Sequence, residues 1–260
     1  MLCIQLVLQQ QPVGLTSGMT EVEHNCGGLE LDGILVINPR DFVDRRRSIE
    51  RQLQPLALKY EFIHSYDAGD LDAATIGKYF KNADLSPGQQ SCALKHLQAL
   101  RLIAERNWQR ALVLEDDAIL SRDFSEGIRK ALRESDGFDF PYVLLVGSGG
   151  NQYTPRSRRV PGQCLYRADR GRLTEAYVLA SQTARLRAEW IDRNGISLPI
   201  DNLFDRMDRE LNIRLYWLEP PIVEQGSKNG RFRSVLEQAP PNFVRRVTSV
   251  LQKLRRKYLY

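Results

Sequence analysis

The sequence predicts an α/β fold with a mainly parallel central sheet flanked by helices. Residues 31–37 are mostly apolar, residues 42–58 have helical periodicity, and residues 60–66 form a second strand-like segment. A strand, a helix and a strand joined by connections this short are the repeating unit of a parallel sheet. The later segments 111–114 and 142–146 are uniformly apolar, as strands covered on both faces are.

The local signals between these segments support the same fold. Ser86 can cap a helix, Pro87 suits the first helical position, and Gln89 can reach back to complete a capping box, so we expect a long helix to start here. Gly147 to Gly150 lack a following lysine at P-loop spacing and predict only a flexible loop near the site. The remaining expected elements are a long flexible loop over 151–172, a strand over 176–180, helices over 182–194 and 202–211, and a late edge strand or loop over 216–223.

Composition places the chain among soluble globular proteins. It has 260 residues, of which 42% are hydrophobic and 27% charged, and this excludes a mostly disordered or fibrous chain. No apolar run approaches the ~20 residues of a membrane-spanning helix, and the first residues do not resemble a secretory signal. The four cysteines have no metal-ligand spacing, so we interpret them as reduced thiols and expect a cytoplasmic protein.

The chain divides into three parts. Residues 1–30 have no periodic pattern and predict a disordered extension, residues 31–238 form the folded domain, and residues 239–260 form a basic tail. The tail, with basic residues and apolar residues on one helical face, predicts an amphipathic helix over 240–260 on the inner, anionic face of a membrane. The alternative is a helix packed on the domain. Without the tail the charge is near neutral, so nucleic-acid binding is not indicated.

The strongest chemical signal is Glu115-Asp116-Asp117, directly after the strand 111–114. Ligands of open α/β sheets bind at the carboxyl ends of the strands. Alternate residues of an extended segment point the same way, so Glu115 and Asp117 share one side. Two carboxylates there suit Mg²⁺ or Mn²⁺. The alternative is a solvated acidic turn.

Residues 85–97 and 111–117 together resemble glycosyltransferase family 25, a lipooligosaccharide-biosynthesis family that includes collagen galactosyltransferases. The similarity spans about residues 33–235. Further resembling segments are 36–46, 62–67, 174–181, 199–201 and 221–225.

The resemblance implies a GT-A-like nucleotide-sugar-binding domain and a metal-dependent, inverting transfer reaction. A hexose, most often galactose from UDP-galactose, would pass to a hydroxyl of a saccharide such as lipooligosaccharide, an acceptor that can be lipid-linked. A carboxylate would serve as the base, and Mn²⁺ or Mg²⁺ would neutralise the charge of the leaving diphosphate.

The acidic trio and the end of the first strand carry the donor-site roles that the resemblance implies. Asp117 is the first choice for direct metal contact. Glu115 would share the metal, or it would reach the ribose or a metal-bound water. Asp116 would support Asp117 or Glu115 in these roles. Asn38 and Arg45 would hold uracil or phosphate, although a turn-forming asparagine and a solvated arginine are the plain alternatives.

Four other residues have weaker assignments from the same resemblance. Asp67 would accept hydrogen bonds from the uridine, unless it only forms a local turn. Asp201 would be the catalytic base or contact the acceptor, unless it caps the helix that follows it. Gln225 would complete the donor or metal site. His96 is interpreted as a histidine hydrogen-bonded in or beside the core, with a diphosphate contact as the alternative.

The sequence departs from the family pattern at three positions. Gln89 stands where glutamate is usual, Ser91 where glycine is usual, and Lys95 where serine is usual. The first change removes a charge, and Lys95 would add affinity for phosphate. These departures leave the donor sugar open and sustain a rival hypothesis, a catalytically degenerate nucleotide-sugar-binding protein. A membrane adaptor with a basic tail is a third.

Overall fold

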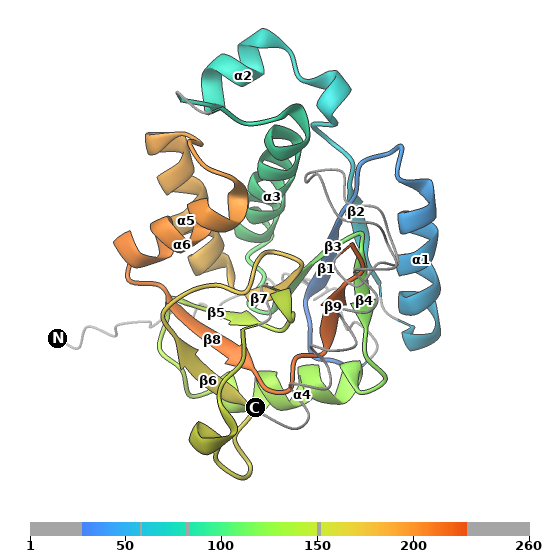
Figure 1. Cartoon of the computed structure of the whole chain (residues 1–260), viewed down its shortest axis with the longest axis vertical. Helices are drawn as coiled ribbons and strands as arrows, with labels where there is room; N and C mark the ends of the chain where they lie inside the picture. The colour runs from blue at the N-terminus through green and yellow to red at the C-terminus, as the bar shows by residue number, and fades with distance from the viewer. Residues whose placement is uncertain (1–27, 58, 82–83, 150–151, 228–260) are drawn as a thin grey trace, which may run out of the picture.

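The computed structural model describes residues 28–227, apart from residues 58, 82–83 and 150–151. The predicted tail over 239–260 and most of the predicted N-terminal extension lie outside these residues. Figure 1 shows the helices and strands, which in chain order are β1 (Gly33–Ile37), α1 (Val43–Leu53), β2 (Glu61–Ile63), α2 (Ala73–Tyr79), α3 (Pro87–Glu105), β3 (Ala111–Glu115), β4 (Ala118–Leu120), α4 (Phe124–Ser135), β5 (Tyr142–Leu145), β6 (Leu165–Ala168), β7 (Ala176–Leu179), α5 (Ser181–Asn194), α6 (Ile200–Glu210), β8 (Arg214–Leu218) and β9 (Val223–Gln225).

The central sheet has the strand order β2-β1-β3-β7-β5-β8-β6. Strands β1, β2, β3, β5 and β8 run in one direction, whereas β6 and β7 run in the opposite direction. The prediction of a mainly parallel sheet is therefore confirmed. A second, two-stranded sheet pairs β4 with β9.

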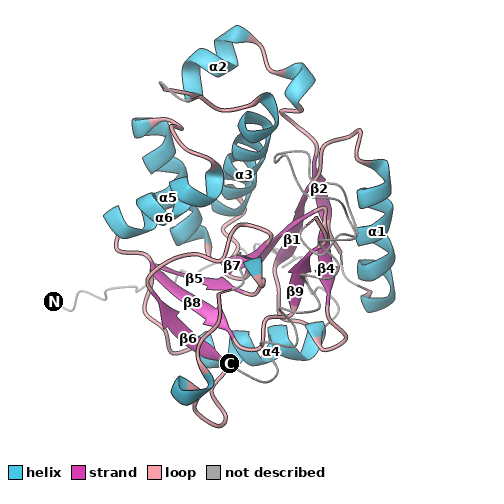
Figure 2. Cartoon of the chain, viewed as in Figure 1, coloured by secondary structure: helices cyan, strands magenta, loops and turns pink. Residues whose placement is uncertain are grey.

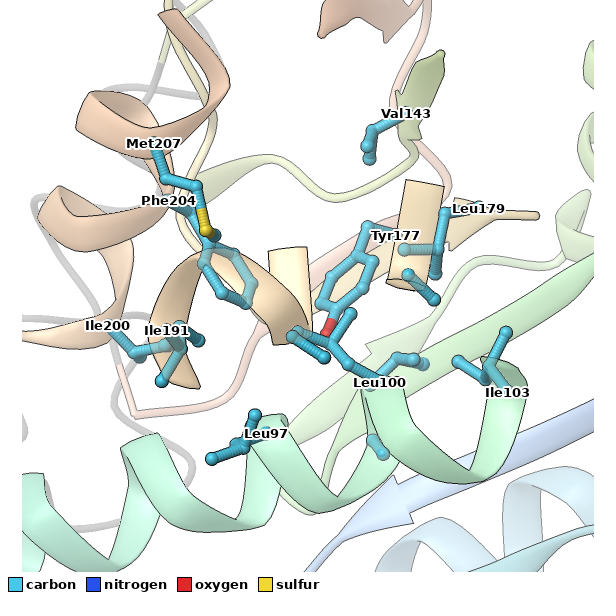
Figure 3. Close-up of a cluster of buried hydrophobic side chains, with 14 of the residues drawn as sticks. Leu97, Leu100, Ile103, Val143, Tyr177, Leu179, Ile191, Ile200, Phe204 and Met207 are labelled. Atoms are coloured by element: carbon cyan, nitrogen blue, oxygen red, sulfur yellow. The ribbon is translucent and has the colours of Figure 1, made fainter. Parts of the chain in front are cut away.

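Helices cover both faces of the sheet, as the sequence predicts (Figure 2). Side chains alternate along each strand, so that Leu35 and Val113 pack into one core cluster with α3, α5 and α6. Val36 and Leu114 pack into the other cluster with α1 and α4. Figure 3 shows the first cluster, in which Tyr177 of β7 lies among apolar side chains of α3 and α6.

The predicted capping box fixes the start of α3. The Ser86 hydroxyl accepts a hydrogen bond from the Gln89 backbone N–H at 3.3 Å. The Gln89 side-chain carbonyl accepts one from the Ser86 backbone N–H at 2.9 Å. A glutamate at position 89 would accept the same bond, so the glutamine found here preserves the helix start. This long helix then carries Cys92 and His96 beneath the end of β3.

Two expectations about the C-terminal half are wrong. The segment 151–172, expected to be a flexible loop, contains β6 and a short 3₁₀ turn, Arg156–Arg158. Its end is held by Arg172, whose buried guanidinium donates to Glu219. The segment 216–223, expected to be an edge strand or loop, begins inside β8, an inner strand, because β6 pairs with it and takes the edge.

The described core includes residues just before the expected boundary at residue 31. Leu29 is buried in the core cluster that contains α1 and α4. Glu30 pairs with Arg110 at 2.5 Å. Among the described residues, none of the helices combines the length and apolar character needed to cross a bilayer.

Candidate functional site

The candidate site lies at one edge of the sheet, where the carboxyl ends of β1 and β3 meet the amino end of β7. Ala176 of β7 lies opposite Leu114 of β3 in an antiparallel pair. The Glu115 backbone N–H donates to the Glu175 carbonyl at 3.0 Å. This reversal brings the residues that precede β7, Thr174 among them, beside the acidic residues that follow β3.

Asp116 is the centre of a buried polar cluster that includes Asn38 and Arg45. The Asn38 amide donates to one Asp116 oxygen at 2.8 Å, and the Arg45 guanidinium donates to the other at 3.1 Å. Burial raises the pKa of Asp116 to about 7, although the positive charge of Arg45 opposes the rise. Because both of its oxygens are engaged, Asp116 holds the other two side chains in place.

Glu115 and Asp201 meet on one hydroxyl group. The Thr174 hydroxyl lies 2.7 Å from Glu115 Oε1 and 2.6 Å from Asp201 Oδ1. It has a single proton, so it can donate to only one carboxylate at a time. Burial and the negative charge of Glu115 raise the pKa of Asp201 to about 6. The helix-cap interpretation of Asp201 is wrong, because α6 has Pro199 at its N-cap and no side-chain cap bond.

Asp117 offers an oxygen atom that the fold leaves unsatisfied. Its Oδ2 accepts a hydrogen bond from the Ser227 backbone N–H at 3.1 Å. Its Oδ1 is buried without a hydrogen-bond partner, as is Oε1 of Gln225. Burial and the charge of Glu115 raise the pKa of Asp117. Buried oxygens without donors cost free energy, and a hard cation with oxygen ligands would satisfy them. The donor set therefore fits Mn²⁺ or Mg²⁺.

A family model described as "Glycosyltransferase family 25 (LPS biosynthesis protein)" matches residues 32–203. The chain belongs to glycosyltransferase family 25. The matched range runs from the start of the sheet to α6, so it includes Asn38, the acidic trio and Asp201 but not Gln225.

Two animal proteins are similar to this family 25 member. Procollagen galactosyltransferase 2 of Mus musculus is 21% identical over 217 residues, which are 78% of this chain and 35% of the relative. Procollagen galactosyltransferase 1-A of Xenopus laevis is 22% identical over 219 residues, with the same two shares. The chain thus spans about a third of the length of these curated relatives.

Solved structures show a weaker likeness. Mannose-1-phosphate geranyltransferase from Thermus thermophilus aligns with 70% of this chain and 58% of its own, at 12% identity and a TM-score of 0.31. A TM-score this low does not establish a shared fold.

Asp67 and Lys95 form a separate cluster at the end of β2 in the family 25 chain. The ammonium group of Lys95 lies 2.7 Å from Asp67 and donates to the Ser65 carbonyl at 2.8 Å. Burial opposes ionisation of Asp67, but the hydrogen bonds from Lys95 and Arg40 outweigh it and lower its pKa. The suggestion that Lys95 adds phosphate affinity is wrong, because its side chain is fully buried with these partners.

Glu175 and Thr174 are site residues that the sequence did not predict. Glu175 is fully buried and accepts a hydrogen bond from the Gly149 backbone N–H. Burial and the charge of Glu115 raise its pKa well above the ordinary value. Its carboxyl group fills the space that a side chain at Gly147 or Gly149 would need, so the expectation of a flexible glycine loop is wrong for these two residues.

His96 is buried beside the acidic trio, as the core interpretation predicts. Its Nδ1 lies 3.0 Å from the Tyr177 hydroxyl, and its Nε2 lies 3.5 Å from Glu115 Oε1. Cys92 lies one turn earlier on α3. The ligand atoms of Cys92, His96 and Glu115 all lie within 4.8 Å of one another, a grouping that could hold a metal ion.

Proposed function

We propose that this family 25 chain is a metal-dependent, inverting hexosyltransferase with a GT-A-like nucleotide-sugar site. UDP-galactose is the first donor to test, and the acceptor is a saccharide hydroxyl. The observation that carries the proposal is the unsatisfied Asp117 oxygen near Glu115, at the end of a buried strand within the family match. The two relatives are named galactosyltransferases, which supports galactose as the sugar.

Asp117, Glu115 and Gln225 would hold Mn²⁺ or Mg²⁺. A divalent cation bound there supplies positive charge to the diphosphate of the donor. Arg45 adds a fixed positive charge, because Asp116 holds its guanidinium in a partly buried position. A preoriented charge of this kind stabilises a leaving diphosphate without reorganising at the moment of reaction.

Asp201 is the proposed base. The acceptor oxygen bonds to the anomeric carbon as the bond to the diphosphate breaks, and Asp201 takes the proton of the acceptor hydroxyl. A pKa of about 6 suits this role, because the group is ionised at neutral pH and still basic enough to bind a proton. Thr174 orients the carboxylate through its hydroxyl.

Asn38 and Asp67 are the proposed contacts to the uridine of the donor. Asn38 keeps one buried side-chain oxygen without a hydrogen-bond partner, which can accept from a uracil N–H. Asp67 forms ion pairs with Lys95 and Arg40, which hold its carboxylate in one position. Uridine would donate to the lone pairs of this carboxylate that the two ion pairs leave free.

The proposal also includes the class of the acceptor and the location of the enzyme at a membrane. The description of the matching family supports a lipopolysaccharide-type saccharide, which can be lipid-linked. The basic tail over 240–260 would then hold a cytoplasmic enzyme at the inner face of an anionic membrane. Deleting residues 240–260 is expected to abolish binding to anionic vesicles while turnover of a water-soluble acceptor survives, and unchanged vesicle binding would refute this role.

The test of the activity is release of UDP from UDP-galactose, UDP-glucose and a UDP-N-acetylhexosamine, with Mn²⁺ and a panel of saccharide acceptors. We expect acceptor-stimulated release that Asp117→Asn and Asp201→Asn each reduce by about 100-fold or more. Asp44→Asn is the matched control, because this side chain is 94% exposed.

The rival function, nucleotide-sugar binding without catalysis, gives a different result in the same assay. It predicts Mn²⁺-dependent binding of UDP with no acceptor-stimulated release. The capping role of Gln89 removes one reason to favour the rival, because the glutamine at this position serves the helix start as well as glutamate does.

A further inference from the structure

Cys92, His96 and Glu115 bring sulfur, nitrogen and oxygen ligands together at the edge of the proposed donor site. Cys92 and His96 are four residues apart on α3, so their side chains lie on one face of the helix. Glu115 reaches the same place from the end of β3. The three ligand atoms lie within 4.8 Å of one another.

The second nitrogen of His96 is oriented toward this grouping and has no hydrogen bond. The Tyr177 hydroxyl engages Nδ1 at 3.0 Å, as an outer partner of a metal-bound histidine does. The other nitrogen, Nε2, is fully buried and makes no well-formed hydrogen bond among the described residues, although it lies 3.5 Å from the Glu115 carboxylate. An unsatisfied buried ring nitrogen beside a carboxylate is costly unless a proton or a cation lies between them.

The separation of His96 Nε2 from Glu115 Oε1 is compatible with a metal site. At 3.5 Å it exceeds the usual N–H···O range of about 2.7 to 3.2 Å. Zinc bonds of about 2.0 to 2.2 Å to nitrogen and oxygen, set at a tetrahedral angle, place the two ligand atoms about 3.4 Å apart. The observed distance therefore fits two ligands of one ion, and the Cys92 sulfur lies within 4.8 Å of both ligand atoms.

We propose that Cys92, His96 and Glu115 form a Zn²⁺ site that is separate in chemistry from the oxygen-only site at Asp117. A thiolate and an imidazole favour Zn²⁺ strongly over Mn²⁺ and Mg²⁺. The thiol proton passes to solvent when the sulfur binds the ion. Three protein ligands leave a fourth position for water or for an oxygen of a bound substrate.

The two sites share Glu115, and this sharing has a consequence for activity. Zn²⁺ bound to Cys92 and His96 withdraws the Glu115 carboxylate from the Mn²⁺ position, so Zn²⁺ is an inhibitor of the Mn²⁺-supported reaction. This consequence rests on the proposed function, whereas zinc binding itself does not.

Cobalt spectroscopy of the full chain tests the site directly. The chain is freed of metal with a chelator, the chelator is removed, and Co²⁺ is added as the probe. We expect one equivalent of Co²⁺ to give tetrahedral d–d bands and a thiolate-to-cobalt charge-transfer band, both removed by one equivalent of Zn²⁺. Cys92→Ser should abolish the charge-transfer band and weaken Zn²⁺ binding by about tenfold or more.

Matched controls separate this site from incidental binding by thiols and histidines. Cys164→Ser removes another free thiol and should leave the spectrum unchanged. His96→Gln should lose the tetrahedral bands, whereas His64→Gln, at a half-buried histidine near the end of β2, should retain them. Circular dichroism confirms folding, and His96→Gln decides the question if Cys92→Ser does not fold.

Two results would overturn the proposal: no charge-transfer band in the wild-type chain, or a band that survives in both Cys92→Ser and His96→Gln. Failure of the glycosyltransferase proposal is recognised separately. In that case Zn²⁺ and Co²⁺ bind as described, but Mn²⁺ and UDP-sugars give no UDP release.

Discussion

Replacing Asp201 with asparagine is expected to stabilise the fold at neutral pH while it removes the proposed base. Burial and the charge of Glu115 raise the pKa of Asp201 from 3.8 to about 6. A carboxyl group whose pKa is raised by folding contributes stability below pH 4 that is lost as the pH rises through 6. At about 1.4 kcal/mol per pH unit, the loss has a ceiling of about 3 kcal/mol.

Solvent screening reduces this ceiling, whereas the hydrogen bonding of the site preserves the remaining gain. The Asp201 side chain is only half-buried, so solvent screens part of the unfavourable charge. Asparagine retains an oxygen that can accept the hydrogen bond from Thr174, so little is lost on substitution. We therefore expect Asp201→Asn to be more stable than wild type by about 1 to 2 kcal/mol at pH 7.5, which corresponds to a rise of about 2 to 8 °C in the melting temperature.

Urea denaturation at pH 4 and pH 7.5 measures the effect, with EDTA present because a bound cation would stabilise the ionised cluster. The free-energy difference between variant and wild type should be near zero at pH 4 and favour the variant at pH 7.5. Asp44→Asn, at an exposed position, should show no such pH dependence. A variant that is less stable than wild type at pH 7.5, or a difference independent of pH, would show that folding does not raise the pKa of Asp201.

Three other substitutions test individual contacts. Thr174→Val removes a hydrogen bond to a carboxylate worth about 1.5 to 3 kcal/mol, so kcat/KM should fall by about 10- to 100-fold and the acidic limb of its pH profile should move to higher pH. Thr174→Ser should stay within a few-fold of wild type. Equal losses in both variants would contradict the role of the Thr174 hydroxyl in orienting Asp201. Gly149→Ala places a methyl group against the carbonyl of Arg172, so urea denaturation should show a free energy of unfolding lower by about 1 to 3 kcal/mol. An unchanged value would mean that Gly149 does not pack against Arg172 and Glu175. Lys95→Met leaves Asp67 without its buried partner, so the free energy of unfolding should fall by about 3 kcal/mol. If Lys95→Met lowers it by as much in an Asp67→Asn background, the two side chains are not coupled.

Local chemistry made several features of the fold predictable. The capping box at Ser86 and Gln89 depends only on residues three apart, and it forms as the sequence predicts. The segment 111–114 has no polar side chain, which favours a strand covered on both faces, and β3 is such an inner strand. The acidic trio then had to lie at the carboxyl end of that strand, beside the end of β1.

The direction of β7 was not predictable from its sequence. The residues of a short apolar strand fit a parallel or an antiparallel neighbour equally well, and only tertiary contacts select one. Because β7 runs opposite to β3, the residues before it lie at the site. Thr174 and Glu175 were therefore missed as site residues, although they lie in a segment that resembles the family.

The wrong predictions for Lys95, β6 and β8 have one cause: each depends on a partner that is distant in the chain. Lys95 is an unexpected charge on an apolar helix face, and its partner Asp67 lies on a different element. β6 is hidden within a basic, glycine- and proline-rich stretch, and its pairing with β8 moves β8 into the sheet. Neither contact leaves a periodic signal in the sequence.

We propose that Asp117, with Glu115, holds the divalent cation that binds the donor diphosphate. Electron paramagnetic resonance of free Mn²⁺, titrated with the chain in the presence and absence of UDP, tests it most directly. We expect UDP to strengthen Mn²⁺ binding and Asp117→Asn to weaken it by about tenfold or more, while Asp44→Asn leaves it unchanged. An Asp117→Asn chain that binds Mn²⁺ and UDP as tightly as wild type would contradict it.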